Sequence, residues 1–489
     1  LMQIVKGEFI KDDDMSEFEV VVETPPGSSL DRSTEILIEV EDKIRSIPEV
    51  VHTFTTTGVR GQYISNVTDS SIYVALKPLG ERERSQQELM QAVRTLMKDM
   101  PDLRVSVQQI NLVSGGGFKA TPFNMVLRGP DLKKLDEYSS ELIHKLKAVP
   151  GFVDTDTGQA LKHPEVQVHI DRQKASDLGV RVEAIASSLR TMVGGEKVSL
   201  YREGDEQYNV RLRLRDEYRK DSGVISGLTV PGSSGIVRLD NVATLSHGSS
   251  PGQIDRYAQE RQITVISNLH NKPLGEAMTN ASKIVGDMKL PAEYSTSYLG
   301  RGKLMAEAFR NFLIAFVLSL IFIYMVLAAQ FESFVHPVTV MTSIFLALPF
   351  GILSIILAGN TLNIYSVMGM FILIGVVKKN GILQVDYTNT LRARGMERYE
   401  AQMLANKVRL RPILMTTFAI IAGMLPVTLG KGDGSSARAS MAIVIVGGQM
   451  MCLLVTLVVI PVVYSAFDDI KLPAFMRNFK FPFKRERAQ

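Results

Sequence analysis

Five long apolar segments in the last third of the chain constrain its fold more than any other feature of the sequence. They cover residues 312–329, 338–358, 362–387, 413–429 and 441–467. Each is long enough, or nearly so, to cross a bilayer as a helix, which takes about 20 residues. Residues 1–300 have an ordinary mixed polar composition. The sequence therefore predicts a soluble part followed by an all-α membrane bundle of five helices at 311–467.

The third apolar segment carries charged and amide side chains, namely Lys378, Lys379, Asn380, Gln384 and Asp386. A charge in mid-membrane costs at least about 2.5–3.5 kcal/mol, so such residues are rarely without a role. Helical spacing places Lys379 and Asp386 on a common face, and does the same for Asn380 and Gln384. An apolar turn follows Lys379, so we expect a charged or proton-linked site there. The alternative, which applies more to Lys378 and Asp386, is that these side chains extend to the membrane surface.

Basic residues are concentrated between the third and fourth apolar segments and after the fifth. The positive-inside rule places that long loop and the basic tail at 468–489 in the cytoplasm, and residues 1–300 on the opposite side. The chain opens with no apolar signal segment. We therefore expect it to be the later portion of a longer polypeptide, or a subunit that needs a partner to deliver its soluble part.

The soluble part predicts two ferredoxin-like subdomains, because strands and helices follow each other in the split βαβ order. The first lies at 12–110, and the second is divided between 118–172 and 260–300, with Glu165–Ile170 counted among its strands. An insertion at 178–258 contains a helix and two hairpins. It is either a docking module or a plain surface elaboration. The predicted fold class is thus an α+β membrane protein with two such subdomains and an inserted module, followed by the bundle.

Several classes of function find no support in the composition. Cys452 is the single cysteine, so disulfides cannot stabilise this chain, and no HExxH or CxxC pattern indicates a metal site. No basic stripe with interleaved aromatic residues indicates nucleic acid as a partner. The spelling GSSPG at 248–252 resembles a nucleophile elbow, but proline follows the serine and the strand–turn–helix context is missing. We therefore expect a protein that is not an enzyme and holds no metal.

Several motifs are specific in combination. They are AAQFESFVHP (328–337), IGVVKKNGILQVDY (374–387), RLRPILMTT (409–417), GMLPVTLGKGDG (423–434) and VIPVVY (459–464). Together they resemble the resistance–nodulation–division efflux pumps, in the branch that exports hydrophobic and amphiphilic compounds. The opening FIKDDDMSEFEVVVETPPGSSL is similar to the start of the second periplasmic half of that family. The resemblance covers nearly the whole chain.

The resemblance implies a C-terminal half of a proton-driven multidrug efflux transporter, driven by the proton gradient and without another cofactor. It implies a bacterial inner membrane location, with residues 1–300 in the periplasm and the tail in the cytoplasm. It also implies a homotrimer that works with a periplasmic adaptor protein and an outer-membrane channel. The two subdomains would be porter subdomains, and the insertion would belong to the funnel that faces the channel. The substrates would be amphiphilic or hydrophobic small molecules.

The resemblance further implies a proton relay in which Lys379 meets two aspartates of the first half of the pump, which this chain lacks. Arg409 and Thr416 match the arginine and threonine that accompany this lysine, and we count Asn380 and Asp386 with them. Arg409 could instead be only an inside-positive anchor, and Thr416 could bond only its own backbone. Weaker candidates for substrate contact lie in the loop at 58–69 and near a similar pocket edge, namely Arg60, Gln62, Tyr63, Ile64, Phe118 and Phe123. A plain strand-connecting loop is the alternative for the loop at 58–69.

Two other functions remain open from the sequence. A protein- or lipid-export relative of the same superfamily would share the spans and differ in the soluble part. A truncated half-chain that does not transport would explain the missing acidic pair. Two adjacent aspartates in a span upstream of Leu1 would favour the pump.

Overall fold

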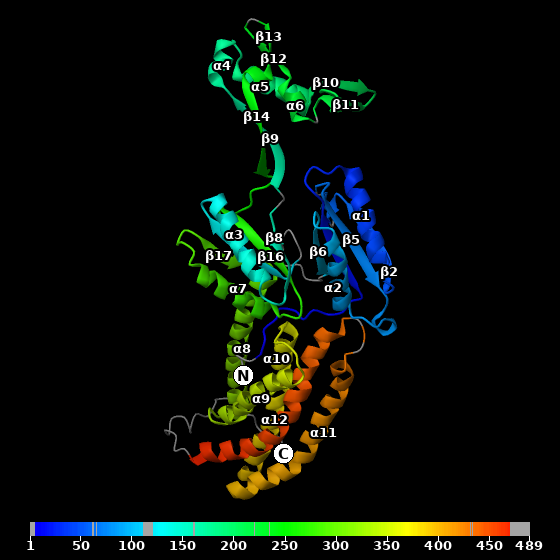
Figure 1. Cartoon of the computed structure of the whole chain (residues 1–489). Coiled ribbons are helices and arrows are strands. Elements are labelled where there is room, and N and C mark those ends of the chain that lie inside the picture. The colour runs from blue at the N-terminus through cyan, green and yellow to red at the C-terminus, as the bar shows by residue number, and fades with distance from the viewer. Residues whose placement is uncertain are drawn as a thin grey trace. The chain divides into compact units, whose positions relative to one another are not determined.

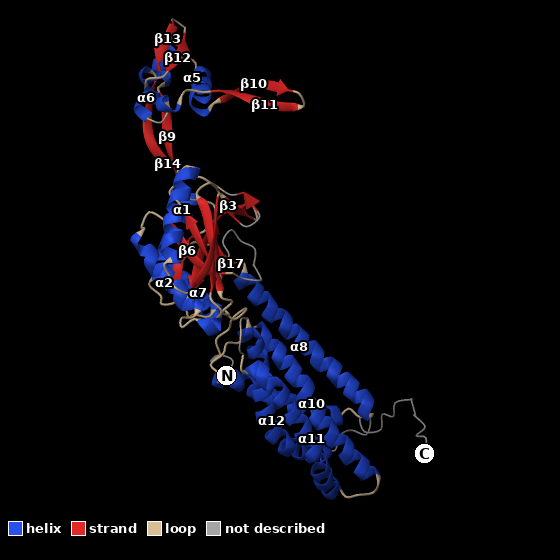
Figure 2. Cartoon of the chain, turned by 90° about the vertical axis from the view of Figure 1, so that its right-hand side faces the viewer, coloured by secondary structure: helices blue, strands red, loops and turns tan. Residues whose placement is uncertain are grey.

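The computed structural model describes residues 5–60, 63–64, 66–110, 121–159, 162–219, 221–233, 235–430, 432 and 434–469, with only the backbone described at 59–60, 63–64 and 163. It divides into two compact units (Figure 1). One unit comprises Leu1–Gln159 and Asp255–Gln489, and the other is Ala160–Ile254. Within the first unit, strands occupy the part that precedes α8, and only helices follow (Figure 2).

The first sheet has the predicted split βαβ topology. Its order is β2-β5-β1-β6 and every pairing is antiparallel. The strands are β1 (Glu17–Glu23), β2 (Val50–Thr57), β5 (Asp69–Leu76) and β6 (Arg104–Gln109). The helices are α1 (Leu30–Arg45) and α2 (Gln86–Leu96). Alternating apolar residues of the strands bury one face against both helices, as period-two and helical patterns require.

Smaller elements complete this subdomain. A capping box of Ser85 and Glu88 begins α2 and satisfies two of its free backbone donors. The other short elements are β3 (Val59–Arg60), β4 (Tyr63–Ile64) and the 3₁₀ turns Leu79–Glu81 and Met97–Asp99.

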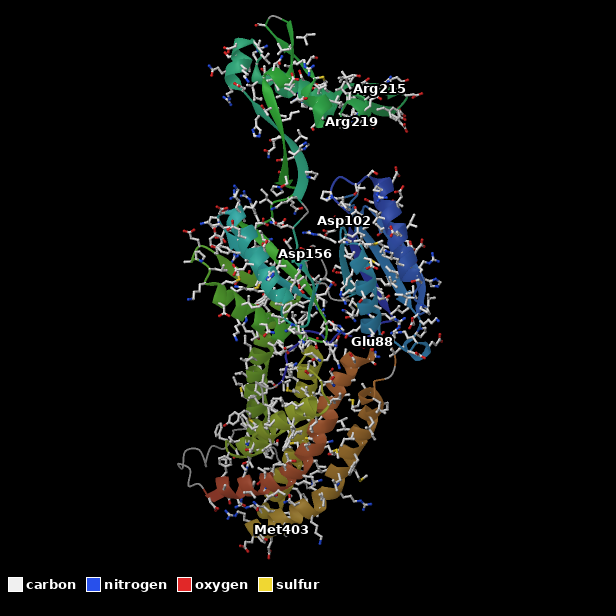
Figure 3. The ribbon with its side chains drawn as sticks, in the orientation of Figure 1. Glu88, Asp102, Asp156, Arg215, Arg219 and Met403 are labelled. Atoms are coloured by element: carbon white, nitrogen blue, oxygen red, sulfur yellow. The ribbon has the colours of Figure 1, made fainter. Side chains whose placement is uncertain are left out.

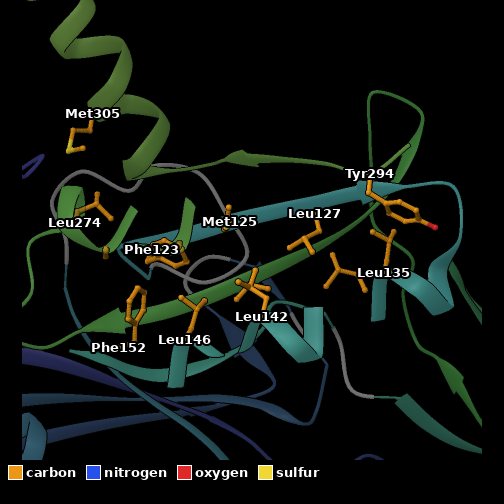
Figure 4. Packing of buried hydrophobic residues seen from close by; sticks show 14 of the residues in the cluster. Phe123, Met125, Leu127, Leu135, Leu142, Leu146, Phe152, Leu274, Tyr294 and Met305 are labelled. Atoms are coloured by element: carbon orange, nitrogen blue, oxygen red, sulfur yellow. The ribbon is translucent and has the colours of Figure 1, made fainter. Parts of the chain in front are cut away.

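The second sheet repeats this topology around a central strand β7, which pairs with β16 and β17. Its edge strands β8 and β15 both pair with β16. The strands are β7 (Phe123–Gly129), β8 (Phe152–Thr157), β15 (Arg256–Tyr257), β16 (Glu260–Leu269) and β17 (Ser295–Tyr298). The helices are α3 (Leu132–Lys147) and α7 (Leu274–Met288). Figure 4 shows their core, where Phe123 meets Phe152 edge to face at 5.4 Å.

One predicted strand belongs to the other unit. Residues Glu165–Ile170 are extended as expected, but β9 (Lys162–Ile170) pairs antiparallel with β14 (Ala243–Pro251) and not with the second sheet. The first and last strands of the insertion, β9 and β14, lie side by side and form a two-stranded ribbon of their own. The insertion therefore spans 160–254 and begins earlier than the predicted 178. An alternating pattern predicts a strand but does not name its partner.

The inserted unit has a small core of Ala175, Val180, Ile185, Val230 and Leu239, with Val242 and Ala243. Its helices are α4 (Arg172–Asp177), α5 (Val182–Leu189) and α6 (Ser222–Ser226), with a π-helical turn at Arg190–Gly194 and 3₁₀ turns at Asp216–Tyr218 and Leu239–Asn241. Both predicted hairpins are present, as β10 (Glu196–Glu203) with β11 (Glu206–Leu212) and β12 (Thr229–Gly232) with β13 (Gly235–Arg238).

Five helices of the described residues are long and apolar enough to cross a membrane. They are α8 (Arg301–Phe331), α9 (His336–Leu357), α10 (Ile364–Ala393), α11 (Arg398–Thr428) and α12 (Ser435–Asp469). The predicted long loop between the third and fourth spans is mostly helical, because α11 already begins at Arg398. Only a turn around Gly395, in a left-handed conformation, separates α10 from α11.

The bundle is closely packed at α9, α10 and α12 and open at α8 and α11. In the most apolar 18 residues of each helix, 44–50% of the residues are buried in α9, α10 and α12, and 11% are buried in α8 and α11. Glycines allow the close approach, since a Cβ at Gly369 would lie 2.7 Å from the Met441 carbonyl oxygen and one at Gly447 would lie 2.3 Å from Ser354 Cβ. Small residues at helix contacts are typical of membrane bundles.

Candidate functional site

Lys379 lies on the open face of α10. Its side chain is exposed, as are Met368, Ile372 and Asp386, and a Cβ added at Gly375 would meet no atom within 4 Å. The spacing of these residues defines one helical face. In the part of the chain that the structure describes, Lys379 belongs to no ion pair or hydrogen bond. A cation on an apolar spanning helix is thus left facing away from α9, α11 and α12.

The opposite face of α10 is buried and carries amides. Asn380 is 4% exposed and Gln384 2% exposed, so the predicted common face of these two residues is the inner one. Both amide atoms of Gln384 lack a hydrogen-bond partner among the described residues. An unpaired buried amide costs about 1–3 kcal/mol of stability, so Gln384 is an unfavourable residue for the stability of this bundle.

Arg409 packs on α10 in a cation–π contact. Its guanidinium carbon lies 4.7 Å from the centre of the Tyr387 ring, and its Nε is buried without a hydrogen-bond partner among the described residues. Thr416 donates its hydroxyl to the Ile413 carbonyl oxygen at 3.1 Å, which is the backbone bond that the alternative interpretation predicts. Neither contact reaches Lys379.

Helix geometry nevertheless places these residues at related depths. α10 and α11 are consecutive neighbours that run in opposite directions, and Arg409 lies beside Tyr387. Seven residues toward the start of α10 from Tyr387 lead to Asn380, and seven residues onward from Arg409 lead to Thr416. At 1.5 Å per residue, both steps cover about 10 Å along the bundle. Thr416 is therefore nearly level with the Lys379–Asn380 pair.

The weaker candidates for substrate contact lie in different parts of the soluble region. Phe123 is fully buried in the core of the second subdomain, where it packs against Phe152 and Tyr298, and its contact with substrate stays a prediction. Arg60, Tyr63 and Ile64 lie on the short hairpin of β3 and β4, and their side chains are outside the description. Gln62 and Phe118 lie outside the described residues.

A cavity of about 290 Å³ lies between the two subdomains of the first unit. Strands β1 and β6 form one wall, and β8 with the end of α3 forms the other. Arg104 on β6 joins them, since its Nη1 lies 3.5 Å from Glu23 and its Nε 3.1 Å from Asp156. Asp156 is labelled in Figure 3. The remaining lining is mixed, with Lys147 beside apolar residues such as Val105 and Phe152. The cavity thus offers both charged and apolar surface.

Asp154 fastens the two subdomains beside this cavity. Its Oδ2 accepts hydrogen bonds from Arg94 Nε at 2.8 Å, the Val107 amide at 3.2 Å and Asn268 Nδ2 at 2.9 Å. Arg94 and Val107 belong to the first subdomain, whereas Asp154 and Asn268 belong to the second. The backbone φ of Asp154 is +51°, a left-handed conformation that aspartate tolerates better than most residues. The two subdomains are thus bonded to each other at Asp154, directly beside the cavity.

Sequence reasoning missed this interface and one inner amide of the bundle, Gln449. Glu23, Arg104, Asp154 and Asp156 sit on ordinary strands, and only the tertiary fold brings them together. Gln449 had a usable signal, because it is an amide within the apolar run of α12. It is 1% exposed, and its Nε2 donates to Thr417 Oγ1 at 3.3 Å.

The fold and this arrangement define a multi-pass membrane protein with two split βαβ subdomains before its last helices. The sequence profile of the AcrB/AcrD/AcrF family matches residues 1–468. The chain belongs to this family of resistance–nodulation–division efflux permeases.

Individual relatives agree with this assignment. The multidrug resistance protein MdtC of Salmonella agona (strain SL483) is 28% identical over 449 residues, which cover 90% of this chain and 43% of that protein, and MdtC of Salmonella typhimurium gives the same values. A crystal structure of a heavy metal efflux pump superposes with a TM-score of 0.82 at 25% identity, over 96% of this chain and 49% of that one. The chain therefore spans less than half the length of these relatives.

Proposed function

We propose that this chain is the second half of a proton-driven efflux transporter that exports amphiphilic small molecules. The proposal includes an inner-membrane location, with residues 1–300 in the periplasm, and a trimer that works with an adaptor and an outer-membrane channel. The observation that carries it is the exposed, unpaired Lys379 on the open face of α10. Family membership and the missing half of the length of the relatives supply the context.

A lysine in this position has a physical use. An ammonium group is attracted to ionised carboxylates, and the attraction decreases when those carboxylates bind protons. If an acidic pair from the missing half occupies the open face of α10, its protonation changes how tightly the two helices pack. Arg409 and Thr416, on the neighbouring helix α11, would respond to that movement. Proton flow would then be linked to a change in the bundle.

The test is Lys379→Met in the complete pump, expressed in cells that depend on it for resistance. We expect resistance to fall to the level of cells without the pump, with normal amounts of protein in the membrane. The matched control is Lys378→Met, which removes the same charge one residue earlier, on a neighbouring side of α10. We expect this variant to retain resistance. Normal resistance with Lys379→Met would refute the assignment, and so would equal loss in both variants.

We further propose that the cavity between the subdomains lies on the substrate path. Its mixture of ion pairs and apolar wall suits amphiphilic molecules. Val105→Trp would fill part of this space, and we expect it to reduce resistance to bulky substrates more than to small ones. Val51→Trp, at an exposed position of β2, serves as the control and should leave both unchanged. Equal resistance in wild type and Val105→Trp for substrates of every size would contradict this placement.

A metal ion is the second candidate substrate, because the superposed crystal structure is that of a heavy metal efflux pump. Among the described residues, no group of three or more His, Cys, Asp or Glu side chains is arranged to hold a metal. The same resistance assay decides between the two classes, with metal salts and amphiphilic compounds compared in parallel. Resistance confined to metal salts would replace the amphiphile proposal.

A further inference from the structure

The opening segment of the described chain, residues 5–15, runs between the membrane helices and both subdomains, and we call it the strap. Its backbone is bonded to the connection between α9 and α10. The amide of Glu8 donates to the Leu362 carbonyl oxygen at 2.9 Å. In the other direction, the amide of Leu362 donates to the Lys6 carbonyl oxygen at 2.9 Å, and the amide of Ile364 to the Phe9 carbonyl oxygen at 3.2 Å. The Phe9 side chain is buried in the core of the second subdomain. The strap is thus a physical link between the bundle and that subdomain.

Three consecutive aspartates of the strap contact three different elements. Asp12 pairs with Arg301 at the start of α8, at 3.7 Å. Asp13 accepts a hydrogen bond from the Ser436 amide at the start of α12, at 2.9 Å. Asp14 accepts from the Gln86 amide at the start of α2 and pairs with Arg82 in the first subdomain. A movement of the helix ends would therefore reach both subdomains through one short segment.

Glu8 occupies the point where the strap meets the α9–α10 connection. Its carboxylate accepts a hydrogen bond from Thr361 Oγ1 at 2.7 Å. The ionisable groups around it are Asp12 and Lys11 from the strap and Arg301 from α8. Lys11 is itself held by Asn360 at 2.6 Å, and Arg301 pairs with Asp12. On the side of α7, Lys6 pairs with Glu276 at 3.0 Å. Among the described residues, no cation forms an ion pair with Glu8.

Burial raises the pKa of Glu8 from 4.5 to about 7, and the neighbouring Asp12 adds to this effect, against the hydrogen bond from Thr361 and the charges of Arg301 and Lys11. Burial also raises the pKa of Asp12, against the attraction of Arg301. Two carboxyl groups beside one shared arginine cannot both be ionised without cost.

We propose that the strap is a proton-sensitive joint, in which a protonated Glu8 keeps it bound to the α9–α10 connection and an ionised Glu8 loosens it. This goes beyond the proposed relay, because it places a second proton-responsive point at the boundary between the bundle and the soluble subdomains. An ionised Glu8 needs water and repels Asp12, and opening of the joint supplies water and separates the two charges. The joint would then transmit helix movement more firmly at low external pH than at high pH.

Hydrogen exchange of the peptide covering residues 358–366, measured by mass spectrometry on the purified full chain, tests the proposal. The amides of Leu362 and Ile364 report directly on the bonds to the strap. After correction for intrinsic exchange rates, we expect these amides to lose protection by up to about 30-fold from pH 5.5 to 8.5, the range over which a group with a pKa of about 7 ionises. In Glu8→Gln, which mimics the protonated carboxyl, we expect protection to be equal at both pH values.

The matched control is Glu276→Gln, which removes a carboxylate that pairs with the same strap at its exposed end. We expect it to retain the pH dependence of the wild type. Constant protection in the wild type would overturn the proposal, as would an unchanged pH dependence in Glu8→Gln. Loss of the dependence in Asp12→Asn but not in Glu8→Gln would assign the titration to the wrong residue and overturn it as well. Because exchange is measured without transport, this result is independent of the test on Lys379.

Discussion

The open face of α10 and the strap are two charged regions of the same unit that differ in whether their charged side chains have partners. On α10, Lys379 is exposed and belongs to no ion pair of the described residues. On the strap, the three aspartates Asp12, Asp13 and Asp14 each have a partner from a different element. The strap aspartates are thus paired within the described residues, whereas Lys379 is not. A charge without a partner in an apolar helix is the basis of the proposal that an acidic pair packs on this face.

The difference also separates stability from function. Groups that are fully paired within the chain should matter for folding, because their removal leaves a buried charge alone. Charged groups that are exposed and unpaired among the described residues, such as Lys379, should matter little for folding and strongly for transport. Four substitutions or conditions with different expected effects on stability test this contrast.

Asp14→Ala should have the largest effect. It leaves the Arg82 side chain, which is fully buried, without its carboxylate, and such a loss costs about 3–5 kcal/mol. We expect a clear decrease in the thermal unfolding temperature of the solubilised chain. Asp102→Ala is the control, since Asp102 is exposed and forms no ion pair among the described residues (Figure 3). Equal unfolding temperatures for both variants would mean that the strap is not fastened at this point.

Gln384→Leu should stabilise the bundle by about 1–3 kcal/mol, because it removes two buried amide atoms that lack partners. The matched variant is Gln402→Leu, where the amide exchanges hydrogen bonds with Ser465 at 3.0 and 3.1 Å. We expect the first substitution to raise the thermal unfolding temperature and the second to lower it. A decrease in both would show that Gln384 has a partner after all.

The pH dependence of stability should carry a contribution from Glu8. Its pKa in the folded chain, about 7, lies above the ordinary value of 4.5, so folding favours the protonated carboxyl. This contribution is fully present below pH 4.5 and is lost as the pH rises through 7. We expect the difference in unfolding temperature between wild type and Glu8→Gln to change over this range and to be constant above it. A constant difference from pH 4 to 8 would contradict the assignment.

Lys379→Met should have the smallest effect on stability, less than about 0.5 kcal/mol, although we expect it to abolish transport. The measurement is the thermal unfolding temperature of the solubilised chain, compared with the resistance that the same substitution gives in the complete pump. A decrease comparable with that of Asp14→Ala would place Lys379 among the structural residues and remove the contrast between the two regions.

Local sequence pattern was sufficient for most of the fold. The spacing of apolar residues located the helices and strands of both subdomains, and the apolar runs located all five spanning helices, because these patterns depend only on neighbours in the chain. The pairing of β9 was wrong for the opposite reason, since Glu165–Ile170 alternates equally well for either sheet. The helical start of α11 was missed because its first turns are polar and lie outside the apolar run.

The residues of the candidate site also differ in whether the sequence could predict them. Lys379 was found because a charge within an apolar run is conspicuous, whereas Arg409 and Thr416 were named from the resemblance to the pump family. The role of all three remains a proposal. The network around Asp154 was not found, because Arg94, Val107 and Asn268 are distant in sequence and ordinary in composition. The full burial of Phe123 was not predicted, because an aromatic residue at a strand end fits both a core and a pocket.

The pairing of β8 with β16 has a consequence for how such proteins diversify. The second sheet is continuous across the point where the inserted unit departs, since β8 and β16 are direct neighbours. The insertion closes on itself through the β9–β14 ribbon, whose last pair joins Lys162 to Pro251. Its length and surface can therefore be exchanged between relatives at little cost to the sheet. The inserted unit and the two split βαβ subdomains can then evolve as separate modules of one polypeptide.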